Sequence, residues 1–336
     1  MTKKRIALWV LFTVIAFLWV LSLDVRPEMN IIYGASFSRF HSDELKLDWK
    51  KTYLAILDDL KVRHLRLSAH WPLTEPKKGV YNFTELDFQI KEAEKRSASV
   101  ILAVGHRLPG WPECHTPDWV MSLSADQRDQ ELLKYVETVV NRYKNSPALQ
   151  YWQVENEVFL KFFSRASCEL HNMNAEENLK KEIDLVHRLD PIHPIIITDS
   201  GEFGTWYEAY NSGDVFGTSI YLYVWWRNFL GPIRYPITPA FFRIKHSIVR
   251  LIYGTKPSII IELSGEPWLL QPIVDTPIEI QLERMGIDKF NEMINISTKV
   301  GFNTSYLWGA EWWYWMKQNG HPEFWNRARE LYKNSP

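Results

Sequence analysis

The stretch that decides the fold reads Leu149-Gln150-Tyr151-Trp152-Gln153-Val154-Glu155-Asn156-Glu157. It is a short apolar and aromatic run that ends abruptly in an amide and a carboxylate. Such a run is typical of a barrel strand that leaves a packed core and presents polar groups at its C-terminal mouth. A carboxylic acid held there against aromatic walls has a raised pKa and can donate a proton near neutral pH. If Glu157 has this role, a second carboxylate must end a facing strand, and Glu262 ends the run 258–262.

Strand-like and helix-like runs alternate along the rest of the chain, which predicts a parallel sheet with helical crossovers. Polar residues concentrate after the strands, which is the end of a (β/α)8 barrel where chemistry takes place. With no linker or low-complexity tract, we expect one α/β domain, a single (β/α)8 TIM barrel over residues 29–336. The predicted strands are 30–36, 64–68, 99–104, 149–157, 194–198, 215–221, 258–262 and 303–308, and the predicted helices are 48–61, 85–95, 127–143, 175–189, 239–252, 285–300 and 323–332.

Residues 1–28 do not fit the barrel pattern. Three basic residues at positions 3–5 precede an uncharged run, 6–23, which is just long enough to span a bilayer. Positive charge before the run predicts a cytoplasmic N-terminus. A cleaved signal peptide is the alternative, but only residues 20–22 faintly resemble a cleavage site. We therefore expect an N-terminal transmembrane helix, an uncleaved signal-anchor, with the barrel outside the cytoplasm, in the periplasm or at the cell surface.

The composition indicates which classes of ligand and cofactor the chain suits. The net charge is −1 with charges of both signs interspersed, which argues against nucleic acid. The 16 tryptophans suit a large core, with a few at strand ends suited to stacking on sugars. Cys114 and Cys168 predict one disulfide in an exported domain. We find no His-Glu-x-x-His, cysteine cluster or glycine-rich phosphate loop, so the sequence implies neither a metal nor an organic cofactor.

Two motifs carry a family resemblance. Asn156-Glu157 on the fourth predicted strand, paired with Glu262 on the seventh, is similar to the clan-A glycoside hydrolases, the retaining sugar-cleaving enzymes built on this barrel. After the second strand the chain reads Trp71-Pro72-Leu73-Thr74-Glu75-Pro76, followed by Gly79, Tyr81 and Phe83. It resembles a Trp-x-x-x-Glu-Pro-x-x-Gly-x-Tyr-x-Phe run that bacterial members often carry there.

The resemblance implies a role for each residue. Glu157 is the expected general acid/base and Glu262 the expected nucleophile. Retaining hydrolysis needs two such carboxyl groups roughly 5–5.5 Å apart, one to attack the anomeric carbon and one to protonate the leaving oxygen. The other residues that we expect to meet the substrate or the nucleophile are Arg66 and Tyr221 as donors to Glu262, Asn156 at the sugar 2-hydroxyl, Trp308 under the sugar ring, and His70, Trp71, His106, Glu202 and Glu266 as further contacts.

Several assignments have alternatives at this point. Glu155 has the same strand parity as Glu157, so either it faces the interior with partners or a bulge resets the register. Glu262 competes with Glu266, and we favour Glu262 because a strand holds a nucleophile more rigidly than a loop. Tyr223 shares the parity of Tyr221, which we favour because it lies nearer the strand.

The predicted function is hydrolysis of β-glycosidic bonds with retention, through a covalent glycosyl-enzyme, on a carbohydrate substrate. Transglycosylation at the same site is one alternative, with an acceptor sugar in place of water. A catalytically inactive carbohydrate-binding surface protein is another, although a binder has no need for the carboxylate pair. A metal-dependent barrel hydrolase is disfavoured by the scarcity of histidines at the predicted strand ends.

Overall fold

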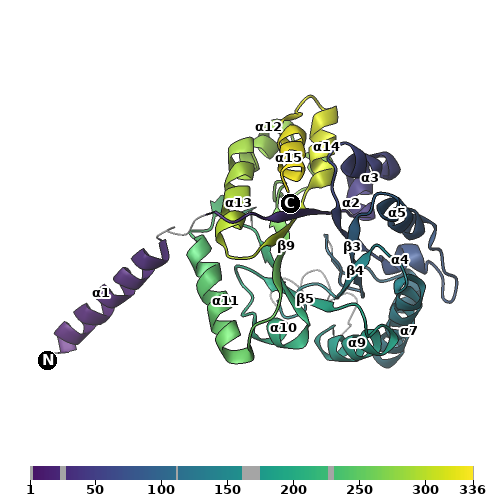
Figure 1. Ribbon diagram of the computed structural model, residues 1–336, viewed down its shortest axis with the longest axis horizontal. Coiled ribbons are helices and arrows are strands. Elements are labelled where there is room, and N and C mark those ends of the chain that lie inside the picture. The colour runs from purple at the N-terminus through teal and green to yellow at the C-terminus, as the bar shows by residue number, and fades with distance from the viewer. Residues whose placement is uncertain (1–2, 23–27, 111–112, 161–174, 226–230, 336) are drawn as a thin grey trace.

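The computed structural model describes residues 3–22, 28–110, 113–160, 175–225 and 231–335. Within these residues, parallel strands form one closed barrel in the order β1-β10-β9-β6-β5-β4-β3-β2, with helices around it (Figure 1). The predicted (β/α)8 barrel is therefore confirmed. The barrel strands are β1 (Ile32–Ser36), β2 (His64–Ser68), β3 (Ser99–Val104), β4 (Leu149–Val154), β5 (Ile195–Ser200), β6 (Val215–Ile220), β9 (Ser258–Ser264) and β10 (Thr304–Trp308).

The long helices coincide with the predicted ones to within two residues at most ends. They begin where the sequence offers caps: Asp48 accepts hydrogen bonds from the first backbone N–H groups of α3, and Ser124 with Gln127 forms a capping box on α7. Their apolar faces pack on the outer side of the barrel. These helices are α3 (Trp49–Asp58), α5 (Thr84–Glu94), α7 (Ala125–Tyr143), α9 (Ala175–Leu189), α11 (Pro239–Tyr253), α13 (Ile287–Lys299) and α15 (Glu323–Lys333).

Shorter elements follow the carboxyl ends of the strands and were not predicted. They are too short to show a clear hydrophobic period in sequence. Several of them surround the mouth of the barrel and supply its walls. They are α2 (Arg39–Glu44), α4 (Trp71–Thr74), α6 (Asp118–Met121), α10 (Tyr207–Ser212), the β7 (Tyr223–Trp225) and β8 (Pro232–Arg234) hairpin, the 3₁₀ turn η2 (Ile273–Asp275), α12 (Ile278–Arg284) and α14 (Ala310–Gln318).

The barrel interior changes from apolar to polar along the strands. A separate apolar cluster fills the inside of the barrel, distinct from the core between barrel and helices, and consists of Ile101, Ile196, Val215, Ile259, Ile261 and Tyr306. On β4 the interior residue Gln153 lies two positions beyond Tyr151, which packs against this cluster. The apolar cluster thus forms a floor, and the polar side chains above it face the mouth.

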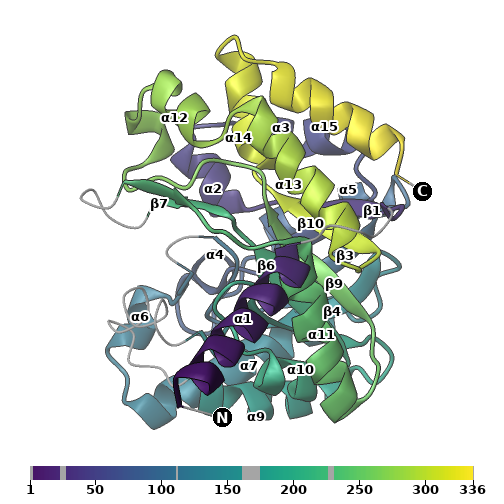
Figure 2. The ribbon, with the colours of Figure 1, turned by 90° about the vertical axis from the view of Figure 1, so that its left-hand side faces the viewer.

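The N-terminal helix α1 (Lys3–Ser22) extends away from the barrel (Figures 1 and 2). In the part of the chain that the structure describes, no helix is long and apolar enough to cross a membrane. The predicted transmembrane helix is therefore not supported. The basic residues 3–5 belong to the helix itself.

The disulfide prediction concerns one described residue. Cys114 is buried, and its backbone pairs with that of Arg107 in an antiparallel bridge. Cys168 lies outside the described residues. The bond between Cys114 and Cys168 therefore stays a prediction.

Candidate active site

Glu262 reaches the interior of the barrel through an irregularity in β9. Thr218 and Ser219 on β6 pair with Ile260 and Glu262, so Ile261 is an extra residue on β9. Such a bulge bends a strand and re-aims its side chains. Here it lets Ile261 join the apolar cluster while the next side chain, Glu262, meets polar partners inside the barrel.

Two donors hold the Glu262 carboxylate. Arg66 Nη1 donates to Oε2, and the Tyr221 hydroxyl donates to Oε1. Arg66 is 1% exposed and Glu262 is 13% exposed, so the ion pair is largely shielded from water. A guanidinium keeps its charge at any ordinary pH. The carboxylate predicted to be the nucleophile therefore lies against a permanent cation.

Arg66 also joins Glu262 to the end of β4. Its Nε donates to Gln153 Oε1 at 2.8 Å, and its Nη2 donates to Asn156 Oδ1 at 2.9 Å. Asn156 Oδ1 accepts further hydrogen bonds from Gln153 Nε2 and from the hydroxyl of Thr198 on β5. The amide oxygen of Asn156 is thus occupied by the protein, and the side chain is fixed beside Glu157.

The question of Glu155 and Glu157 is settled by the backbone after Val154. Both glutamates have positive φ, 60° and 46°, so the regular strand alternation ends before them. Glu155 is 1% exposed, and its two carboxylate oxygens accept the backbone N–H groups of His106 and Arg107. Although burial acts to raise the pKa of Glu155, the facing His106 ring and these N–H groups lower it below its ordinary value. Glu155 is an interior residue with partners.

The surroundings of Glu157 raise its pKa, unlike those of Glu155. Burial, together with the charges of Glu113 and Glu262, raises the pKa of Glu157 to about 8. A hydrogen bond from Ser219 on β6 to the Glu157 side chain lowers this pKa but does not outweigh the burial. Its backbone is fixed on both sides, because its N–H donates to Thr198 Oγ1 and its C=O accepts from Arg107 Nη1. With this raised pKa, Glu157 is a protonated acid near neutral pH.

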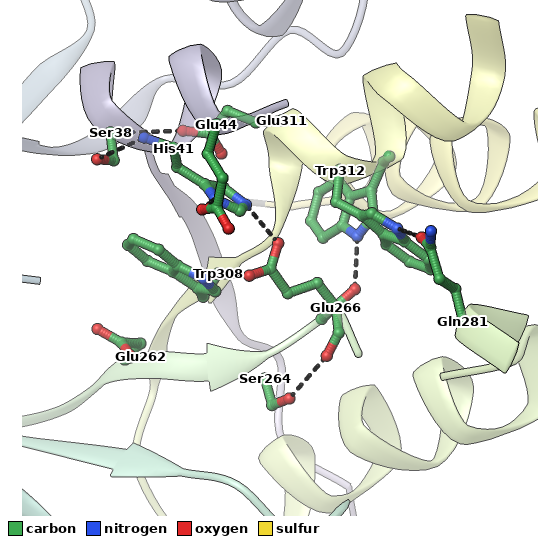
Figure 3. A network of polar contacts seen from close by, with 12 residues as sticks. Ser38, His41, Glu44, Glu262, Ser264, Glu266, Gln281, Trp308, Glu311 and Trp312 are labelled. Carbon is green, nitrogen blue, oxygen red and sulfur yellow. Dashed lines mark hydrogen bonds and ion pairs between the residues drawn. The ribbon is translucent and has the colours of Figure 1, made fainter. Parts of the chain in front are cut away.

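Glu266 and Trp308 belong to a second polar network at the mouth (Figure 3). Trp308 Nε1 donates to Glu266 Oε1 at 2.7 Å, and Glu266 Oε2 pairs with His41 Nε2 at 2.7 Å. His41 Nδ1 contacts Glu44 at 3.1 Å, so carboxylates flank both ring nitrogens. Burial acts to lower the pKa of His41, but Glu266 and Glu44 raise it well above its ordinary value. Glu266 fixes the indole of Trp308, a role distinct from that of Glu262.

Two other residues predicted to contact the substrate, Trp71 and His70, are buried. Trp71 is fully buried, stacks on Tyr135 with ring centroids 5.1 Å apart and donates to Glu75, so it is a core residue with no face for a ligand. His70 is also buried, packed between the rings of Phe40 and His115. Contact of Trp71 and His70 with substrate therefore stays a prediction.

His106 and Glu202 each contact a residue next to the predicted catalytic carboxyl groups or their partners. His106 is 0% exposed, with its Nδ1 3.2 Å from the carboxylate of Glu155. Glu202 accepts the backbone N–H of Tyr221, and burial raises the pKa of Glu202 to about 7. We assign His106 to the support of the β4 end and Glu202 to the placement of Tyr221.

Several site residues escaped the sequence analysis. Gln153, Thr198 and Ser219 are neutral polar residues inside otherwise apolar strands, which is the signal that could have identified them. Arg107 is 1% exposed and donates both to the carbonyl of Glu157 and to Glu113. Arg107 lies three residues beyond the end of β3, and no motif marks it.

Part of the chain is similar to known glycoside hydrolases. Residues 66–178 match the model of Glycosyl hydrolase family 10. This segment includes Arg66, Asn156 and Glu157. Over 133 residues the chain is 27% identical to an endo-1,4-beta-xylanase 2 from Claviceps purpurea, which covers 39% of this chain and 39% of the relative. The chain thus spans about two fifths of the length of that curated relative.

Solved structures share the fold. A native xylanase 10B from Thermotoga maritima superimposes with a TM-score of 0.54 at 17% identity and covers 83% of each chain. A glycosylated endo-beta-1,4-xylanase from Gloeophyllum trabeum superimposes with a TM-score of 0.55 at 15% identity. The match covers 93% of this chain and 98% of that chain. A beta-galactosidase from the haloarchaeon Halorubrum lacusprofundi superimposes with a TM-score of 0.57 at 15% identity. The match covers 83% of this chain and 52% of that chain.

The family match, the curated relative and the closed eight-stranded barrel agree with the resemblance first seen in Asn156-Glu157 and Glu262. These findings fit the clan-A glycoside hydrolases, the superfamily of retaining glycosidases built on the (β/α)8 barrel, which this chain resembles.

Proposed function

We propose that this protein hydrolyses β-glycosidic bonds with retention of configuration, with Glu262 as nucleophile and Glu157 as general acid/base. The observation that carries the proposal is the opposite treatment of the two carboxyl groups. Arg66 and Tyr221 donate hydrogen bonds to the Glu262 carboxylate, whereas burial and neighbouring negative charge raise the pKa of Glu157 to about 8. A carboxylate paired with a guanidinium and a carboxyl group with a raised pKa are suited to the nucleophile and acid roles.

In the first step, a carboxylate oxygen of Glu262 attacks the anomeric carbon as the glycosidic bond breaks. Glu157 gives its proton to the departing oxygen, and a glycosyl ester forms on Glu262. Negative charge leaves Glu262 in this step, so the Arg66 and Tyr221 hydrogen bonds weaken in the ester and strengthen again when the carboxylate is released. In the second step, Glu157 takes a proton from water, which attacks the anomeric carbon and frees the sugar.

Asn156 and Trp308 suit the binding of the reacting sugar. Because the oxygen of Asn156 is already held by Arg66, Gln153 and Thr198, its NH₂ group is the part available to a substrate hydroxyl. A hydrogen bond to the 2-hydroxyl strengthens in the transition state of retaining enzymes. The Trp308 indole, held by Glu266, offers an apolar face to the sugar ring.

The substrate that we propose to test first is β-1,4-xylan and its oligomers. The matched family region and the curated relative, an endo-1,4-beta-xylanase 2, favour it. A β-galactoside is the second choice, because a beta-galactosidase shares the fold at a TM-score of 0.57. A panel of aryl β-glycosides that includes β-xylosides, β-galactosides and β-glucosides distinguishes the two.

The acid role is tested by Glu157→Gln. Glutamine cannot protonate a leaving group, so cleavage of natural linkages should fall far more than cleavage of aryl glycosides whose leaving groups need no proton. Glu137→Gln, on the exposed face of α7, is the matched control and should leave both rates unchanged. Equal losses on the two substrate classes would remove Glu157 from the acid role.

A further inference from the structure

The ring of His41 lies between two carboxyl groups at the mouth of the barrel (Figure 3). Its Nε2 is 2.7 Å from Glu266 Oε2, and its Nδ1 is 3.1 Å from Glu44 Oε2. An ionised carboxyl group only accepts hydrogen bonds, and a neutral imidazole carries a proton on just one of its nitrogens. With both carboxyl groups ionised, both contacts are hydrogen bonds only when His41 is the doubly protonated imidazolium. The positions of the atoms therefore indicate a cation at His41.

The acidic groups that face His41 come from three parts of the chain. Glu44 lies on the same helix, Glu266 follows β9, and Glu311 lies on α14. His41 is 7% exposed and Glu311 is 1% exposed, so water screens these charges only weakly. Burial acts to lower the pKa of His41, but the three glutamates raise it well above its ordinary value. The acidic surroundings thus agree with the imidazolium that the contacts of the ring indicate.

Helix α2 holds His41 in place through its first turn. The Ser38 hydroxyl accepts the backbone N–H of His41 and so caps the helix. The backbone N–H of Ser38 in turn donates to Glu311 Oε1 at 2.6 Å. Glu311 lies in the first turn of α14, three residues after Trp308, and β1 pairs with β10 in the barrel. The helix that carries His41 is therefore tied to the segment that carries Trp308.

Glu266 joins His41 to the indole of Trp308. Its Oε1 accepts the indole N–H at 2.7 Å while its Oε2 meets His41. The stem of Glu266 has little room to turn, because a Cβ placed on Gly309 would lie 2.9 Å from the Glu266 Cβ. The His41 ring also lies beside the Trp308 ring, with centroids 5.7 Å apart. His41 therefore contacts both the indole and the carboxylate that holds it.

We propose that His41 is a positioning residue, an imidazolium that fixes Glu266 and, through Glu266, holds the Trp308 indole in the orientation that binds the reacting sugar. The sugar contact rests on the function proposed above, whereas the orientation of the indole does not. Within the described residues, the hydrogen-bond partners of the His41 ring are Glu44 and Glu266, neither of which belongs to the proposed catalytic pair. Loss of His41 should therefore weaken sugar binding more than the chemical step.

The first test follows the indole N–H signal of Trp308 by NMR in the full chain without substrate, with Trp308→Phe to assign it. His41→Phe keeps a ring beside the indole but cannot donate to Glu266, so the signal should shift and its proton should exchange faster with water. His41→Gln keeps an N–H donor and should restore part of the original signal. His187→Phe is the matched control, because His187 pairs with Asp214 at the surface. An unchanged signal in His41→Phe, or a larger change in His41→Gln, overturns the proposal.

A double-mutant cycle on glycoside hydrolysis tests the consequence for binding, with circular dichroism to establish that each variant is folded. His41→Phe and Glu266→Gln should each raise KM by about tenfold with a smaller change in kcat, and the double variant should raise it no further, because both act through one contact. His187→Phe should change neither constant. Effects that multiply in the double variant contradict the proposal. A chain without activity on any glycoside contradicts the proposed function instead, and the NMR measurement then decides the role of His41.

Discussion

Arg66 and Glu262 form an ion pair across the interior of the barrel, from the end of β2 to β9, with the guanidinium 1% exposed. The same guanidinium donates to Gln153 and Asn156 at the end of β4. One side chain therefore fixes both the nucleophile that we propose and the residue next to the acid. Substitution of this arginine should disturb both halves of the site at once.

Arg66→Lys tests this link. A lysine ammonium has no planar fork and cannot reach Gln153, Asn156 and Glu262 together. We expect kcat/KM to fall by about 10²–10³, equivalent to roughly 3–4 kcal/mol of transition-state stabilisation. Arg96→Lys is the matched control, because Arg96 pairs with Asp58 and Glu92 at the surface. An Arg66→Lys enzyme with the activity of the Arg96→Lys enzyme would show that the ion pair is not needed for catalysis.

The pH dependence of kcat/KM reports the acid. Glu157 must be protonated to act, and its pKa is raised to about 8, so activity should decline as pH rises through that value. The negative charge of Glu113 contributes to the raised pKa, and Glu113→Gln should move the alkaline limb to lower pH. Glu137→Gln provides the comparison at an exposed position. An alkaline limb that stays in place, or moves upward, in Glu113→Gln argues against Glu157 as the titrating group.

Tyr221→Phe removes one donor from Glu262. The tyrosine hydroxyl donates to Oε1 of the carboxylate, and phenylalanine preserves the ring contact with Trp268. We expect kcat to fall by about 10- to 100-fold with a smaller change in KM, because a charge-assisted hydrogen bond is lost. Tyr223→Phe is the control, since the Tyr223 hydroxyl donates to Glu292 instead. Equal effects of the two substitutions would contradict the choice of Tyr221 over Tyr223.

Gly105 supports the β4 end through its backbone conformation. It has φ +135°, and a Cβ placed on it would lie 2.4 Å from Glu155 Oε1. Gly105→Ala should therefore lower the free energy of unfolding by about 3 kcal/mol or more, from strain and from displacement of a buried carboxylate. Gly79→Ala, with φ +74° and no atom within 4 Å, should cost only about 1 kcal/mol. Urea unfolding of both variants measures the difference, and equal values would place Glu155 outside this support.

Most of the barrel could be predicted because strand and helix periods repeat with little interruption. Three strands, β2, β3 and β10, end at the residues expected from sequence, and α9 matches at both ends. The elements that escaped prediction, such as α2 and the β7–β8 hairpin, are shorter than the window over which periodicity can be seen. They matter for the site nevertheless, since α2 supplies His41, the partner of Glu266.

Local backbone geometry limited the prediction of the site. Strand parity suggested that Glu155 and Glu157 face the same way, but positive φ at both residues separates them. Similarly, regular alternation would place Ile261 and Glu262 on opposite faces of β9, and only the extra residue in its pairing with β6 explains their contacts. Single-residue departures of this kind leave no period in the sequence. The motif residues could be identified because they end predicted strands and resemble those of a known family.

The most direct test of the central claim, that Glu262 is the nucleophile and Glu157 the acid/base, is azide rescue followed by NMR identification of the product anomer. In Glu262→Ala, azide enters the space of the missing carboxylate, and an aryl β-glycoside should yield the α-glycosyl azide. In Glu157→Ala, azide replaces the water of the second step and should yield the β-glycosyl azide. If Glu266→Ala rather than Glu262→Ala gives the α-glycosyl azide, the assignment of the nucleophile is contradicted.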